Sequence, residues 1–152
     1  MELQGPIIVV DDDPDDHVIF KTIFEMLEVT SAIKYFDSAG TMLDYLKTTT
    51  EEPFIIFCDI NMPLISGLDL RENIYYDHDL RRKNIPFVFL SNAAQSKQVK
   101  RAYELTVQGY FTKASSFEET RRKIKLILQY WLECEHPSLK KEYGLTDNHH
   151  LL

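Results

Sequence analysis

Short apolar runs alternate with stretches of helical periodicity along most of the chain. Five runs, bounded by turn-forming or charged residues, are typical of buried strands and lie at residues 6–10, 32–36, 54–58, 86–90 and 109–111. After each run, apolar residues recur every three to four positions, which predicts amphipathic helices. We expect these helices at about residues 14–27, 39–46, 67–76, 95–105 and 117–132, with a charged loop at 77–84.

Residues that favour helix starts stand where these helices are expected to begin. Asp13 precedes Pro14, while Ser38 and Ser116 precede the second and fifth helices. Five strands that alternate with five helices predict a parallel sheet covered on both faces. Because crossovers are right-handed, few topologies remain, and the common small solution is the flavodoxin-like α/β fold with strand order 2-1-3-4-5.

Composition limits the classes of function. The chain has 152 residues, 44% of them hydrophobic, which suffices for one domain with its own core. The net charge of −7 argues against a nucleic-acid partner, and we assign the basic runs at 81–83 and 121–123 to solvated positions. The sequence has neither a membrane-helix pattern nor a signal-peptide pattern, and its two cysteines suggest neither a disulfide framework nor a zinc site. We therefore expect a cytoplasmic protein that does not bind membranes.

Carboxylates follow two of the predicted strands directly. Asp11 and Asp12 come after the first strand, and Asp59 comes after the third. Parallel strands deliver their carboxyl ends to one edge of a sheet, and strands one and three are neighbours in the expected order. Three carboxylates at one place repel each other unless a cation lies among them. The pattern therefore predicts a divalent metal site beside a carboxylate that can act as a nucleophile.

Further polar residues follow the remaining strands, and together they form four ordered motifs. Taken alone, Ser91 after strand four is more typical of a loop-capping hydroxyl, and Lys113 after strand five of a surface lysine. The motifs are Val9-Val10-Asp11-Asp12-Asp13-Pro14, Asp59-Ile60-Asn61-Met62-Pro63 with Gly67, Phe89-Leu90-Ser91-Asn92-Ala93, and Gly109-Tyr110-Phe111-Thr112-Lys113. With these motifs the chain resembles, over residues 4–132, the receiver domain of two-component response regulators.

The resemblance implies a role for each matched residue. Asp59 would accept a phosphoryl group as an acyl phosphate, with Lys113 and Ser91 contacting the phosphoryl oxygens. The cofactor would be Mg²⁺, with Mn²⁺ as an alternative ion. The implied metal ligands are Asp12, Asp59 and the backbone carbonyl of Asn61, with Asp11 acting through a water molecule. The backbone amides of Asn92 and Ala93 would bind the remaining phosphoryl oxygens.

The resemblance also implies a switch and partners. Tyr110 would turn inward when the phosphoryl group draws Ser91 towards it, the alternative being a half-exposed strand aromatic. The partners would be a sensor histidine kinase or a histidine phosphotransfer protein. The face made by residues 95–105, 109–111 and the last helix would contact a partner or a second copy of the chain. We interpret His17, in contrast, as a solvated surface histidine.

Three positions depart from the family pattern. Ala114 stands where proline, often after a cis bond, is usual, and we expect a trans bond because a cis bond to alanine costs about 2.5–4 kcal/mol. Ser91 replaces a commoner threonine, and Asn92 replaces a smaller residue. The charged loop at 77–84 resembles small receivers that serve cyanobacterial phytochromes.

The predicted organisation is a receiver domain over residues 1–133 and a tail over 134–152, with no output domain. We expect a signalling protein rather than an enzyme, but two alternatives stay open. One is a receiver-like binding module that works without phosphorylation, as Ala114 and Asn92 suggest. The other is a phosphatase of the haloacid dehalogenase kind, for which Asp11-Asp12-Asp13 supplies an Asp-x-Asp. That class needs acidic ligands at a strand end after the lysine, whereas Glu118 and Glu119 fall inside a helix.

Overall fold

A single parallel sheet forms the centre of the protein in the computed structural model, which describes residues 1–92 and 94–138. Its order is β2-β1-β3-β4-β5, and every neighbouring pair is parallel, as the alternating pattern predicts. The strands are β1 (Ile7–Val10), β2 (Ile33–Phe36), β3 (Ile55–Cys58), β4 (Phe87–Ser91) and β5 (Gly109–Thr112).

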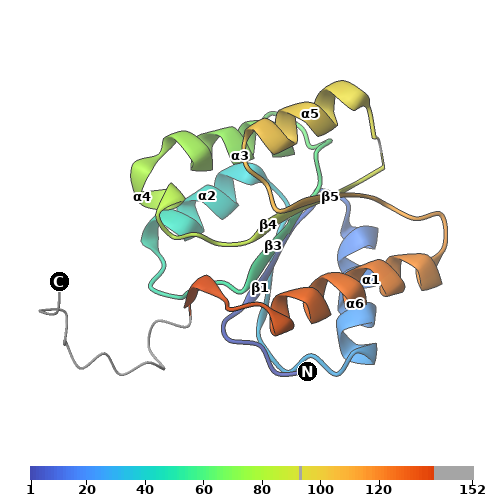
Figure 1. Cartoon of the computed structure of the whole chain (residues 1–152). Helices are drawn as coiled ribbons and strands as arrows, with labels where there is room; N and C mark the ends of the chain where they lie inside the picture. The colour runs from blue at the N-terminus through green and yellow to red at the C-terminus, as the bar shows by residue number, and fades with distance from the viewer. Residues whose placement is uncertain (93, 139–152) are drawn as a thin grey trace, which may run out of the picture.

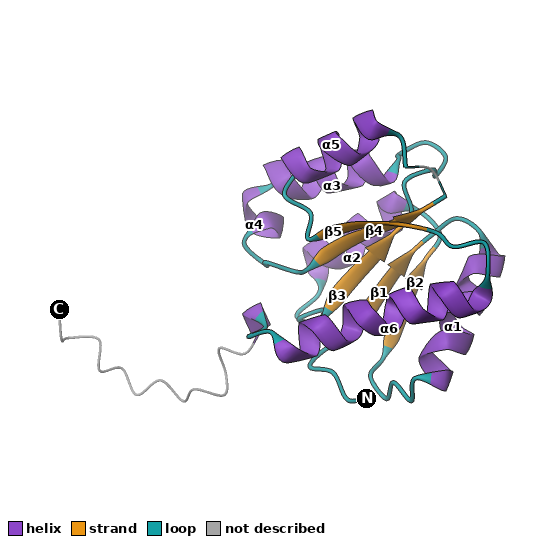
Figure 2. Ribbon diagram, turned by 45° about the vertical axis from the view of Figure 1, so that its right-hand side comes forward, coloured by secondary structure: helices purple, strands orange, loops and turns teal. Residues whose placement is uncertain are grey.

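Helices cover both faces of the sheet (Figure 1). Their bounds are α1 (Pro14–Met26), α2 (Ala39–Thr48), α3 (Gly67–Tyr76), α4 (His78–Arg81), α5 (Ser96–Glu104) and α6 (Phe117–Glu133). Figure 2 shows α1 and α6 on one face and α2, α3 and α5 on the other. Asp13, Ser38 and Ser116 cap α1, α2 and α6, so these three predicted helix starts are confirmed.

The short helix α4 corrects the predicted loop at 77–84. The Asp77 carboxylate accepts hydrogen bonds from the N–H groups of Asp79 and Leu80, which caps the turn. Leu80 is buried against the core beside α3. One apolar residue in a charged run gives no periodicity, so the sequence pattern could not reveal this helix.

The strands divide the core into two layers because successive side chains point to opposite faces. Ile8, Ile56 and Phe89 face the α2–α3–α5 side, and Cys58 packs with them. Val9 and Phe57 face α1 and α6. All residues of β1, β3 and β4 are buried, which explains why these strands, apart from Ser91 at the end of β4, are continuous apolar runs.

A buried arginine joins α3 to the turn before β5. Arg71 donates through Nε to the Leu105 carbonyl at 2.9 Å and through Nη2 to Thr106 Oγ1 at 3.2 Å, while its guanidinium lies over the Phe87 ring. We expect Arg71→Ala to lower the free energy of unfolding by about 2–3 kcal/mol, because a charged donor is lost and a carbonyl is left unsatisfied. Urea denaturation measures this. Exposed Arg82→Ala is the control, and an equal loss there would contradict the assignment.

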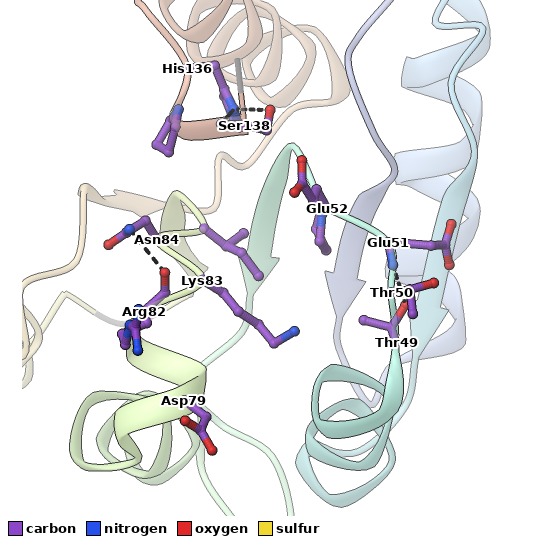
Figure 3. A pocket seen from close by; sticks show the side chains of 13 residues that line it. Thr49, Thr50, Glu51, Glu52, Asp79, Arg82, Lys83, Asn84, His136 and Ser138 are labelled. Carbon is purple, nitrogen blue, oxygen red and sulfur yellow. Dashed lines mark hydrogen bonds between the residues drawn. The ribbon is translucent and has the colours of Figure 1, made fainter. Parts of the chain in front are cut away.

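The chain returns to the sheet after α6. His136 is buried, its Nε2 lies 2.7 Å from the Phe54 carbonyl, and its ring stacks on that of Phe54. The tail predicted for residues 134–152 therefore begins with a docked turn, and residues 139–152 lie outside the described residues. His136 and Ser138 line one side of a pocket (Figure 3). Because Phe54 precedes β3, this pocket is at the end of the sheet opposite to Asp59.

Candidate functional site

The carboxyl ends of β1 and β3 bring the three predicted carboxylates together. Val10 pairs with Cys58, so the next residues, Asp11 and Asp59, leave the sheet at the same level. One carboxylate oxygen from each of Asp11, Asp12 and Asp59 lies within 4.8 Å of the others. Asp11 and Asp59 are buried, whereas Asp12 is exposed. This all-oxygen donor set fits a hard divalent cation such as Mg²⁺.

Local hydrogen bonds fix the orientation of the two buried carboxylates. The Asp13 N–H donates to Asp11 Oδ1 at 2.9 Å. The Ile60 N–H donates to Asp59 Oδ1 at 2.8 Å. The other oxygen, Asp59 Oδ2, lies on the side of the Lys113 ammonium. Both donors follow their carboxylate within two residues, so the loops themselves orient the acids.

Lys113 reaches this cluster from the end of β5. Its backbone N–H donates to the Ser91 carbonyl at 2.8 Å, which holds the two strand ends together. Its Nζ lies 2.9 Å from Asp11 Oδ2 and 3.6 Å from Asp59 Oδ2. No described peptide bond is cis, so the bond from Lys113 to Ala114 is trans, as expected.

The closest partner of Lys113 is a residue that the sequence analysis missed. Asp16, in the first turn of α1, places Oδ2 2.7 Å from Lys113 Nζ. The acidic run after β1 suggested a helix cap and a metal site, and gave no reason to separate Asp16 from Asp15.

The electrostatics of the site follow from burial and from this lysine. Burial raises the pKa of Asp11 to about 6, against hydrogen bonds from Asp13 and Lys113 that lower it. Burial also raises the pKa of Asp59, which Lys113 and the Ile60 N–H lower in part. Burial alone would lower the pKa of Lys113, but hydrogen bonds to Asp16 and Asp11 raise it above its ordinary value. The Lys113 ammonium thus lies beside three carboxylates, Asp11, Asp16 and Asp59, and Asp12 adds a fourth negative charge to the site, a charge balance that favours a further cation.

Ser91 and Tyr110 lie where the sequence predicts them. Ser91 is fully buried at the end of β4, and its Oγ forms no hydrogen bond of standard geometry within the described residues. Ser91 nevertheless lies close enough to Asp59 to lower the pKa of that carboxylate. A buried hydroxyl beside the nucleophile without a well-formed hydrogen bond fits a donor for a group bound to Asp59. Tyr110 is half-buried on β5, with its ring 5.9 Å from that of Phe89. Its switch role stays a prediction.

The sequence analysis also assigns backbone groups of three residues, Asn61, Asn92 and Ala93, to the site. Asn61 is exposed in the loop between β3 and α3, two residues after Asp59. Asn92 is exposed directly after β4, while Ala93 lies outside the described residues. The roles of the Asn61 carbonyl and of the amides of Asn92 and Ala93 therefore stay predictions.

The expectation that His17 is a solvated surface residue is wrong. His17 is half-buried on α1, and its Nε2 lies 2.6 Å from the Asp11 carbonyl. Because a carbonyl oxygen can only accept, Nε2 carries the proton and donates. The ring also packs 5.4 Å from that of Tyr35. His17 thus ties α1 to the backbone of a site carboxylate.

Comparisons with known proteins agree with this geometry. Within the described residues, no helix has both the length and the apolar character needed to cross a membrane. The probable methanogenesis regulatory protein FilR2 of Methanothrix harundinacea is 28% identical over 87% of this chain and 88% of its own length. Response regulator Rcp1 of Synechocystis is 24% identical over 84% of this chain and 88% of its own length.

Solved structures show the same fold. The crystal structure of the phosphorylated cyanobacterial phytochrome response regulator RcpA matches with a TM-score of 0.80 and 24% identity, over 90% of this chain and all of RcpA. The crystal structure of the Mn(2+)-bound form of Rcp1 matches with a TM-score of 0.78 and 23% identity, over 88% and 99% of the two chains. The family model for the response regulator receiver domain matches residues 7–125. The chain therefore belongs to the response regulator receiver domain family.

Proposed function

We propose that the chain is a response regulator that accepts a phosphoryl group on Asp59 in the presence of Mg²⁺. The donor would be the phosphohistidine of a sensor kinase or of a phosphotransfer protein. The observation that carries this proposal is the environment of Asp59, a buried carboxylate with Oδ1 fixed by Ile60 and Oδ2 facing the Lys113 ammonium at 3.6 Å. A carboxylate held in this way is oriented to attack and has a cation beside it.

Three side chains of the site would act directly in the transfer: Asp59, Lys113 and Ser91. A carboxylate oxygen of Asp59 attacks phosphorus, and the new P–O bond forms as the P–N bond to the donor histidine breaks. The imidazole leaves with the electron pair and takes up a proton. Negative charge on the three phosphoryl oxygens is neutralised in part by Lys113, and the buried Ser91 hydroxyl donates to one of them.

The acidic cluster would hold the metal. Receiver domains bind Mg²⁺ or Mn²⁺ at such a site, and Rcp1 has been crystallised with Mn²⁺. Here Asp12, Asp59 and the Asn61 carbonyl would be direct ligands, with Asp11 acting through water. When bound, the ion supplies positive charge that offsets the phosphoryl oxygens and the crowded carboxylates.

The output would be a contact with another protein. Receiver domains of this family are signalling modules. The face formed by α5, β5 and α6, which contains Tyr110, is our proposed surface for a partner or a second copy of the chain. We place this activity in the cytoplasm and assign no role in nucleic-acid or membrane binding.

The test is the intact mass of the protein after incubation with Mg²⁺ and acetyl phosphate. We expect one phosphoryl adduct that requires the metal. Absence of an adduct under all conditions would favour a module that works without phosphorylation. Sustained turnover of p-nitrophenyl phosphate, without a stable adduct, would favour a phosphatase.

The raised pKa of Asp11 predicts how metal binding depends on pH. Below a pKa of about 6 Asp11 is protonated and loses the charge that attracts a cation. We therefore expect the increase in melting temperature caused by Mg²⁺ to be large at about pH 7.5 and small at about pH 5. Thermal unfolding with and without Mg²⁺ measures this.

The metal-free protein should respond in the opposite direction. Since folded Asp11 binds its proton more tightly than the unfolded chain, its contribution to stability falls as pH rises from about 4 to about 6. Asp11→Asn should reduce both effects, and the part that remains belongs to Asp59, whose pKa burial also raises. A variant that keeps the full pH dependence would show that another group is responsible.

A further inference from the structure

The Lys113 ammonium is held from two sides. Asp11 Oδ2 at 2.9 Å comes from the end of β1, and Asp16 Oδ2 at 2.7 Å comes from α1. The side chain of Lys113 is 11% exposed and that of Asp16 is 22% exposed, so both ends of the second contact are largely shielded from water. A shielded charge-assisted hydrogen bond of this length fixes the position of a flexible side chain.

The contact with Asp16 decides where the ammonium can point. A lysine ammonium has three N–H donors on a stem with several rotatable bonds. Asp11 and Asp16 accept from two of them, and Asp59 Oδ2, at 3.6 Å, is too far for a hydrogen bond. This arrangement leaves one donor of the ammonium for a phosphoryl oxygen on Asp59. With Asp16 removed, Asp11 alone would restrain the stem.

We propose that Asp16 is a positioning residue for phosphoryl transfer, an inference that rests on the function proposed above. Asp16 acts through Lys113 and does not touch the phosphoryl group. It holds the ammonium beside Asp59 before the donor arrives, so that the reaction does not have to order this side chain.

The neighbouring Asp15 provides a matched control. It lies in the same first turn of α1, so its carboxylate has the same relation to the helix dipole. It is exposed, and it forms no ion pair within the part of the chain that the structure describes. A comparison of the two positions therefore separates the contact with Lys113 from the general effect of acid at this helix end.

The test compares phosphorylation rates with Mg²⁺ and acetyl phosphate. We expect Asp16→Ala to be about tenfold slower than the wild type or worse, because Lys113 loses its fixed position. Asp16→Asn keeps an oxygen acceptor and should lose no more than about threefold. Asp15→Ala should match the wild type.

A second measurement needs no phosphodonor. In protein labelled with ¹⁵N at lysine Nζ, the hydrogen-bonded Lys113 ammonium should exchange its protons with water slowly. Exchange should become faster in Asp16→Ala but not in Asp15→Ala. A purely structural role of Asp16 would not single out this one ammonium.

The outcomes separate this inference from the proposed function. Absence of an adduct in the wild type overturns both. If the wild type is phosphorylated and Asp16→Ala reacts as fast or faster, only the role of Asp16 is overturned. Equal slowing by Asp16→Asn and Asp16→Ala would assign the effect to charge alone and would also overturn positioning, as would equal slowing by Asp15→Ala.

Discussion

We expect replacement of Asp59 by asparagine to abolish phosphorylation of the protein by acetyl phosphate. Asparagine has nearly the shape of aspartate, and its side-chain oxygen can still accept the hydrogen bond from the Ile60 N–H. The amide is not a nucleophile, however, so no acyl phosphate can form. Because burial disfavours the charge of Asp59, as its raised pKa indicates, the neutral variant should be at least as stable as the wild type. Loss of reaction without loss of fold is the expected signature.

Intact mass and urea denaturation of the same samples measure the two parts of this prediction. Asp37→Asn is a suitable control, because Asp37 follows β2 as Asp59 follows β3 but is exposed. The control should be phosphorylated like the wild type. An adduct that persists in Asp59→Asn would mean that another side chain is the nucleophile.

The sheet and the acidic cluster could be predicted from sequence because local signals determine both. Each strand is a short apolar run, and the alternation with helices leaves few topologies. Once β1 and β3 are neighbours, Asp11 and Asp59 must meet, since each directly follows its strand. Their buried state and common level are consequences of the register Val10–Cys58.

The contacts of Asp16 and His17 could not be predicted in the same way. Both contacts depend on the rotation of α1 about its own axis. The contact of Asp16 also depends on the position of the Lys113 side chain, which lies 97 residues further along the chain. The sequence shows that the first turn of α1 is acidic. Which of its acidic residues faces the site depends on how α1 packs against the sheet, and the sequence does not show this. Buried Arg71 is a similar case, because its partners Leu105 and Thr106 lie in a distant turn.

Gly67 belongs to the second sequence motif, and the structure gives it a specific role. The N–H of Gly67 donates to the Ile60 carbonyl at 2.8 Å, so the start of α3 lies directly against the loop that carries Asp59. A Cβ at this position would lie 2.1 Å from the Asp59 carbonyl oxygen and 2.9 Å from the Ile60 Cα. Its φ is not in the left-handed region, so close approach is the reason for glycine here.

We therefore expect Gly67→Ala to be among the most damaging single-methyl changes in the chain. The colliding atoms are backbone atoms, which cannot move aside by rotation of a side chain, so α3 or the Asp59 loop must shift. The expected loss is about 3 kcal/mol in the free energy of unfolding. A shift of about 1 Å at Asp59 would also slow phosphorylation by about a hundredfold.

Gly40→Ala distinguishes this steric effect from the general consequences of replacing glycine. Gly40 lies in the first turn of α2, and an added Cβ would have no atom within 4 Å. Alanine there should raise stability by about 0.5–1 kcal/mol through its better helix propensity, with no change in phosphorylation. Urea denaturation and the phosphorylation rate of both variants measure the contrast. If Gly67→Ala is as stable and as reactive as Gly40→Ala, then α3 does not lie against the Asp59 loop as described, and the orientation of the nucleophile must have another cause.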